Sequence, residues 1–265
     1  MKKILTGFAA LAAVVVVLPM FAAFEAHVVN VTARIENALS VPVTPITFGT
    51  VFPQEQLEKP LSVELSGSFL TENRVDDVEY IIRQKPKCGV TSDNGTVLVG
   101  PTWTGHVVVT GAGENVTSSI DCVADQPKNL QVGSGQNAGL LPSLCQYISK
   151  HPDGVNSSGT VSTNDGFLNS FHQPFTISPT GTIVWTDVNG RLAKSENDTT
   201  DTWKIDLKVP CFGGYCAQDW ADFVHGINQS ADPSQYTQPI TNEHKVFGCN
   251  LWVEVTGVSE VRLPD

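Results

Sequence analysis

Positive charge is scarce in this sequence. Lys and Arg number 16 among 265 residues, Asp and Glu number 27, and the formal net charge is −11. Nucleic-acid binding depends mainly on Lys and Arg contacts to phosphates, so this balance excludes a nucleic-acid partner held by charge. It also leaves no basic cluster that would hold the chain on an anionic lipid surface. The acidic excess favours solubility at a crowded surface.

The short motifs of the common enzyme classes are missing as well. A zinc hydrolase of the H-E-x-x-H type needs two histidines four residues apart on one helix face. The six histidines never show that spacing (His27, His106, His151, His172, His225 and His244). No G-x-S-x-G is present for a nucleophile elbow, and Gly111-Ala112-Gly113 is too short for a phosphate loop. We therefore expect no enzyme activity, with a metallopeptidase-related protein as the weaker alternative.

Helical periodicity is scarce too, and most of the chain alternates like β-strands. Apolar and polar residues alternate over 61–66, 78–83, 203–209 and 249–256, bounded by Gly, Pro, Asn or Asp. One apolar face per strand means that each sheet covers a core on one side only, so two sheets must face each other. The sequence predicts an all-β, antiparallel two-sheet sandwich over residues 27–265, with short connecting helices (216–228 and 140–150).

The longest uncharged run stands at the N-terminus. Lys2 and Lys3 precede residues 4–24, which carry no charge, as in a secretory signal peptide or an uncleaved membrane anchor. The run is long enough for a bilayer, which takes roughly 20 residues, but a proline and small residues favour cleavage (Pro19, Ala22, Ala23 and Ala26). The positive end stays inside, so everything after residue 26 is expected outside the cytoplasm. Residues 1–26 thus predict a secreted or cell-surface protein that contacts the membrane only through an uncleaved leader.

Six cysteines follow the leader (Cys88, Cys122, Cys145, Cys211, Cys216 and Cys249). An even number in an exported chain predicts disulfides, and six cysteines allow fifteen connectivities. Cys211 and Cys216 flank two glycines in CFGGYC, so we expect a bridge across this tight loop. A zinc site is less favoured, because no second pair has the same spacing.

Residues 86–166 differ from the rest of the chain in composition. They are rich in Gly, Ser, Asn and Asp, and we expect a loop-rich insertion that decorates the sandwich. A bridge from Cys88 to Cys122 would close a hairpin within it. A bridge from Cys145 to Cys249 would attach it to the last strand.

Two further sets of residues suggest ligands. Asp187, Asn189 and Asp198 lie in an acidic stretch whose oxygens suit Ca²⁺, although an Asn-Gly hairpin turn with a solvated loop explains the same residues. The five tryptophans suggest either a sugar-binding strip or core packing. Trp252 is out of phase with the apolar face of its strand and is the exposed ligand candidate. No cofactor other than Ca²⁺ is indicated.

Several features of the chain occur in the order known from one protein family. The leader runs directly into a strand in LPMFAAFEAHVVNVTARI, and a proline-containing loop follows in FGTVFPQEQLEKP. The strand LSVELSGSF, the segment VDDVEYIIRQ and the late strands TWKIDLKVP and CNLWVEVTG come next. This order resembles the TasA/camelysin-like family of exported bacterial proteins over residues 1–85 and 175–258. The insertion and the cysteines depart from the plain family form.

The resemblance implies jelly-roll subunits of extracellular-matrix fibres, in which an N-terminal strand can complete the sheet of the next subunit. In this chain the strand is His27–Ile35, and its assembly residues are Val28, Val29, Val31, Ala33 and Ile35. A free strand can fill the unpaired edge of a neighbouring sheet. The implied partners are other copies of the chain or other surface proteins. The alternatives are an ordinary edge strand in the chain's own sandwich and, for function, a surface adhesin or carbohydrate-binding module.

Overall fold

The computed structural model describes residues 35–42, 44–92, 95, 98–111, 113–152, 154 and 164–260. The chain divides into two units, residues 1–36 and 37–265, and the second contains the helices and strands given below. The predicted leader, with its N-terminal hydrophobic helix, lies outside the described residues. Within the described part of the chain, no helix is long and apolar enough to cross a bilayer.

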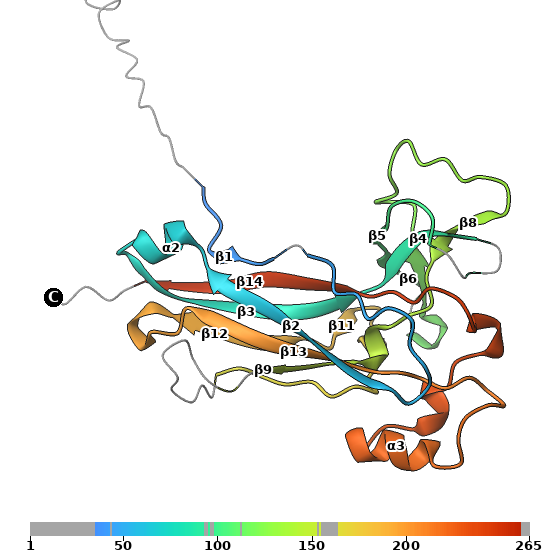
Figure 1. The fold of residues 1–265 in the computed structure, drawn as a ribbon. Helices are drawn as coiled ribbons and strands as arrows, with labels where there is room; N and C mark the ends of the chain where they lie inside the picture. Colours follow the sequence, from blue (N-terminus) through green and yellow to red (C-terminus); the bar gives the residue numbers. More distant parts are fainter. Residues whose placement is uncertain are drawn as a thin grey trace, which may run out of the picture. The chain divides into compact units, whose positions relative to one another are not determined.

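Two antiparallel sheets form the body of the second unit (Figure 1). The larger has the strand order β1 (Leu39–Ser40), β2 (Gln56–Leu65), β13 (Thr200–Lys208) and β9 (Ile148–Pro152). The smaller has the order β12 (Val188–Ala193), β3 (Val75–Lys85) and β14 (Asn250–Glu260). The predicted antiparallel β architecture is therefore confirmed.

The two sheets pack face to face because their strands alternate. β3 and β13 each turn a row of large apolar side chains into one shared core, and all of these are at most 1% exposed (Val78, Tyr80, Ile82, Trp203, Ile205 and Leu207). On β13, the residues that alternate with this inward row are polar and lie on the outer face of the sheet, where Lys204 is exposed. Each fully buried side chain of this size contributes roughly 1.5–3 kcal/mol. The interface between the sheets is thus the main source of stability.

A polar bridge crosses this core. Tyr80 on β3 donates its hydroxyl hydrogen to the Asp201 carboxylate on β13, and Trp203 Nε1 donates to the Tyr80 oxygen at 2.8 Å. The Tyr80 and Trp203 rings also meet edge to face, with centroids 6.4 Å apart. Burial, reinforced by the Asp201 charge, raises the pKa of Tyr80 well above its ordinary value. The phenol therefore keeps its proton, and its role as a donor, at pH values above the ordinary pKa of tyrosine.

Short helices cover the ends of the sheets. Ser66 caps α2 (Gly67–Thr71) by accepting from the Phe69 amide at 3.1 Å, and Lys194 donates to the carbonyls of Phe69 and Glu72 at its other end. α3 (Trp220–Ile227) lies in the segment predicted to be helical and buries its first residue. The 3₁₀ helices are η1 (Gly113–Asn115), η2 (Cys145–Tyr147), η3 (Lys194–Glu196), η4 (Pro233–Tyr236) and η5 (Ile240–Asn242).

Much of the predicted insertion forms small sheets at one end of the main ones (Figure 1). One sheet has the order β5 (Trp103–Thr104), β4 (Lys87–Ser92) and β8 (Gln136–Leu140), and a second pairs β6 (His106–Thr110) with β7 (Thr117–Asp121). A separate hydrophobic cluster supports them (Cys88, Val90 and Trp103). A further two-stranded sheet, outside this region, pairs β10 (Phe175–Ile177) with β11 (Ile183–Trp185).

The boundary predicted for the insertion, residues 86–166, needs one correction. β9 falls inside that range but belongs to the main sheet, where Ile148–Pro152 pairs with β13. The helix expected over 140–150 is also absent, because η2 covers only Cys145–Tyr147 and β9 follows it directly. Residues 148–152 form a strand because they pair with β13, more than 50 positions later in the sequence. The spacing of apolar residues within the segment does not indicate this long-range pairing.

Gly190 supplies a test of the core packing. It lies opposite Tyr80 in the β12–β3 pair, and a Cβ at this position would lie 2.3 Å from Cζ of the Tyr80 ring. We expect Gly190→Ala to lower the free energy of unfolding by about 1–3 kcal/mol through overpacking. Urea unfolding followed by circular dichroism measures the change. The matched control is Gly139→Ala in β8, where a Cβ would meet nothing within 4 Å. Equal effects of the two substitutions would contradict the packing described.

Candidate functional site

A two-layered sandwich has a seam along each side, where the edge strands of the two sheets face each other, and one seam here is closed by hydrogen bonds. Residues 164–172 run between β9 and β12. Leu168 exchanges two backbone hydrogen bonds with Lys150 of β9, at 2.8 and 2.9 Å, and the Gly166 amide donates to the Asn189 carbonyl of β12 at 2.9 Å. We call this side the closed seam. Its edge strands are occupied and offer little for another chain to pair with.

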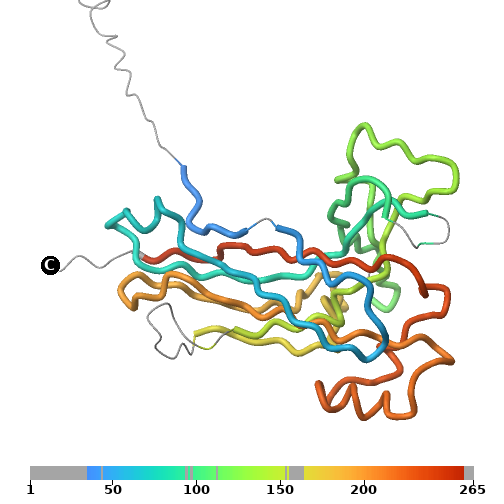
Figure 2. Tube along the Cα trace, viewed as in Figure 1, coloured from blue at the N-terminus to red at the C-terminus, as the bar shows by residue number. Residues whose placement is uncertain are grey.

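The opposite side, between β1 and β14, is held differently, and we call it the open seam. β1 pairs with β2 at only two positions, Leu39 with Leu65 and Ser40 with Glu64. β14 pairs with β3 along one edge, and within the described residues no strand pairs with its other edge. Figure 2 shows the first described segment of the second unit running beside β14. The outer edge of β14 therefore presents backbone groups without strand partners.

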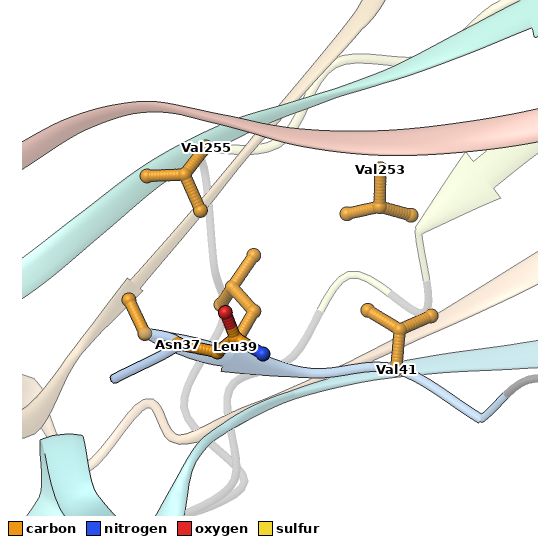
Figure 3. Close-up of a pocket in the computed structure, with 6 residues that line it drawn as sticks. Asn37, Leu39, Val41, Val253 and Val255 are labelled. Atoms are coloured by element: carbon orange, nitrogen blue, oxygen red, sulfur yellow. The ribbon is translucent and has the colours of Figure 1, made fainter. Parts of the chain in front are cut away.

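A cavity of about 220 Å³ lies in the open seam. In Figure 3, Val253 and Val255 point from β14 toward Leu39 and Val41; Asn37 and Ala38 complete the lining. Val255 is 46% exposed although it faces the same side as the core residues of its strand. A cavity with apolar side chains beside a strand edge that no described strand pairs with provides the two features that β-augmentation uses, side-chain pockets and free backbone groups. This combination makes the open seam the candidate functional site.

The predicted assembly strand directly precedes the open seam in the sequence. Val28, Val29, Val31 and Ala33 lie outside the described residues. Ile35 is described and is 94% exposed. The chain reaches the cavity wall at Asn37, two residues later.

The six cysteines form three disulfides: Cys88–Cys122, Cys145–Cys249 and Cys211–Cys216. These are the three pairings considered in the sequence analysis, and they indicate an oxidising environment. The Cys145–Cys249 bridge joins residues 104 positions apart, linking the turn before β9 to the start of β14. In a chain-entropy model a loop of that size gains roughly 4–5 kcal/mol.

The calcium candidates are not brought together. Both carboxylate oxygens of Asp187 accept from Arg83, at 2.7 and 3.0 Å. Asn189 lies in β12, and Asp198 lies beyond the far end of that six-residue strand. A strand rises roughly 3.3 Å per residue, so Asp198 cannot share an ion with Asp187. Among the described residues, no group of three His, Cys, Asp or Glu side chains is arranged to hold a metal ion.

The tryptophans do not form one exposed strip. Trp103, Trp203 and Trp220 are buried. Trp252 is 38% exposed, as its phase predicts, but Lys85 Nζ lies 3.2 Å from the centre of its ring. A cation already stacks on the face that a sugar would use.

A buried polar cluster lies between the sheets beside the closed seam. The His172 imidazole approaches Gln84 Oε1 through Nε2 and the Asn169 carbonyl through Nδ1, both at 2.7 Å. Lys150 is 0% exposed, and its Nζ makes no hydrogen bond within the described residues. Burial lowers the pKa of the Lys150 amine to about 7, against the attraction of Asp187. Burial, and then the Lys150 charge, lowers the pKa of His172 to about 4.

The sequence analysis did not single out Gln84 and Lys150, but each leaves a signal in the sequence. Gln84 continues the inward row of Val78, Tyr80 and Ile82 as a polar residue at a core position. Lys150 follows Ile148 at the inward spacing of β9. A polar residue that stays in phase with a core face is the pattern to look for.

The open cavity can be tested by filling it. We expect Ala38→Leu to leave the free energy of unfolding unchanged or to raise it by up to about 1 kcal/mol, because the added isopropyl group buries apolar surface in existing space. The same substitution at Ala193, which is 1% exposed in the packed core, should cost about 1–3 kcal/mol by overpacking. Urea unfolding measures both variants. A loss at Ala38 as large as that at Ala193 would contradict an open cavity.

Comparison with known proteins gives no outside guide to this site. A scan of protein-family models, a search of curated proteins and a search of solved structures each found no match to the chain.

Proposed function

We propose that the chain is an exported, non-enzymatic subunit of a cell-surface or extracellular-matrix assembly, joined to its neighbours through its N-terminal strand. The observation that carries the proposal is the open seam, where an edge of β14 that no described strand pairs with borders a cavity lined by both polar and apolar surface. The three disulfides support a location outside the cytoplasm. The proposal includes the jelly-roll connectivity implied by the resemblance to the TasA/camelysin-like family.

The N-terminal strand is the proposed occupant of a neighbour's open seam. As an extended strand, residues 28–35 would place Val29, Val31, Ala33 and Ile35 on one face, and Leu39, Val41, Val253 and Val255 supply apolar side chains to the cavity wall. Each backbone hydrogen bond to the free edge would contribute about 1 kcal/mol net. Each large apolar side chain would contribute roughly 1.5–3 kcal/mol if fully buried. Side-chain burial in the seam, more than the hydrogen bonds, would set the affinity.

Donation from each copy to the next gives an open assembly. The surface that donates, residues 28–35, differs from the surface that accepts, the outer edge of β14. Such head-to-tail contacts do not close on themselves unless the rotation between subunits forms a ring. Filaments are therefore the expected product. An uncleaved leader would hold the strand at the membrane, so filament growth needs a cleaved chain.

The alternative function, a surface adhesin or carbohydrate-binding module, has less support. It relies on Trp252, whose ring face is occupied by Lys85. Monomers that bind glycan and show no filaments in electron micrographs would favour this alternative. A protease assay with and without EDTA tests the metallopeptidase-related alternative separately.

The donated strand can be tested by changing one of its faces at a time. We expect the mature protein to form filaments in electron micrographs. Serine at Val29, Val31 and Ile35 should give folded monomers without filaments, because the side chains that enter the neighbour's seam are lost. The matched control places serine at the three residues of the opposite face (Asn30, Thr32 and Arg34) and should keep the filaments.

Two further variants separate donation from self-pairing. Deletion of His27–Ile35 should leave a monomer with the circular dichroism spectrum of the parent protein, whereas loss of folding would show that the strand belongs to its own sandwich. Ala38→Leu, which fills the accepting cavity, should reduce filament length while the monomer stays folded. Unchanged filaments in both serine variants would contradict the proposal.

A further inference from the structure

The buried polar cluster of Gln84, Lys150 and His172 has no part in the proposed assembly. It lies beside the closed seam, whereas the assembly uses the open one. Gln84 comes from β3, Lys150 from β9, and His172 from the end of the segment that closes the seam. Three elements thus meet at a group of side chains whose hydrogen bonds depend on protons.

The hydrogen bonds of His172 require two N–H donors. Nδ1 faces the Asn169 carbonyl and Nε2 faces Gln84 Oε1, each at 2.7 Å. The Gln84 amide nitrogen donates to the Ile148 carbonyl at 3.3 Å. Rotating the Gln84 amide by 180° would let its nitrogen face His172, but its oxygen would then face the Ile148 carbonyl, and two acceptors would be opposed there. A neutral imidazole carries a single N–H, so only the imidazolium satisfies all three contacts.

Lys150 presents the opposite case. Its Nζ is fully buried and has no acceptor among the described residues, so a charge on the amine would lack a hydrogen-bonded partner. The charged groups that act on it are Asp187, whose two oxygens are already bound to Arg83, and His172. A charged His172 disfavours a second charge on Lys150, and the reverse also holds.

We propose that Lys150 and His172 hold one proton between them, carried by the imidazole while the amine is neutral, and that uptake of a second proton opens the closed seam. Two like charges would then repel across the contact between β9 and residues 164–172. Leu168 and Lys150 form the backbone pair at this contact. Acidification would release the segment without touching the disulfides.

The pH range over which stability changes follows from the titration of Lys150 and His172 as a pair. Lys150 and His172 titrate as a coupled pair, with one step near pH 7 and one near pH 4. The two contacts of the His172 nitrogens place the first proton on the imidazole, whereas the individual pKa values would place it on the Lys150 amine. Both pKa values lie below those of the unfolded chain, so the unfolded state binds more protons and stability is lost as the pH falls. The loss begins below the ordinary pKa of lysine and is complete below about pH 4.

The position of the first proton can be read directly by NMR. In ¹⁵N-labelled protein, assigned by comparison with His172→Asn, both imidazole nitrogens of His172 should carry protons at pH 5.5, between the two steps. A neutral His172 at that pH would place the first proton on Lys150 and overturn the proposal.

The opening of the seam is tested by hydrogen exchange of residues 164–172, corrected for the intrinsic effect of pH. Between pH 7 and pH 3.5 the wild type should lose protection there at least tenfold more than Lys150→Met, which keeps the chain length of the side chain but takes no proton. Lys204→Met, on the exposed outer face of β13, should behave like the wild type. Equal loss in wild type and Lys150→Met would overturn the second-proton mechanism.

Discussion

Every edge strand in an open sheet carries backbone groups that need partners, and this requirement governs the whole molecule. Two sheets packed face to face produce two lateral seams. The chain closes one of them with residues 164–172, which bond to strands of both sheets. It leaves the other to side-chain contacts around a cavity. The two sides of the sandwich therefore differ: backbone hydrogen bonds bridge one seam, and a cavity lies in the other.

The strands were predictable wherever a single sheet face explains the residues. In β3, β13 and β14, apolar and polar residues alternate because one side of each strand meets the core. This period of two is visible in the sequence. β9 was not predictable in the same way. Its sequence ISKHP reads as polar, and it becomes a strand because β13 offers a partner more than 50 positions later. The calcium candidates show the converse case. Asp187 and Asp198 are close in sequence, but β12 extends between them and separates them in space.

The candidate site itself leaves little trace in the local sequence. The cavity lies where β1 pairs with the end of β2, next to the irregular pairing of β14 between Val255 and Gly257. The polar cluster depends on a contact between Gln84 and His172, which are 88 positions apart. Neither relation is periodic, so neither can be read from spacing. The sequence does show a polar side chain at a position that is in phase with the core. Such a side chain indicates that a residue distant in sequence must supply its hydrogen-bond partner.

The place of β14 at the end of the chain bears on when the protein can fold. β14 completes the smaller sheet by pairing with β3, and Arg83 and Glu254 across that pair stand 171 positions apart in sequence. The core cannot close before almost the entire chain has been made. Pairing at such separation slows folding, and under the proposed export a late-closing core would keep the cysteines accessible until they reach an oxidising environment.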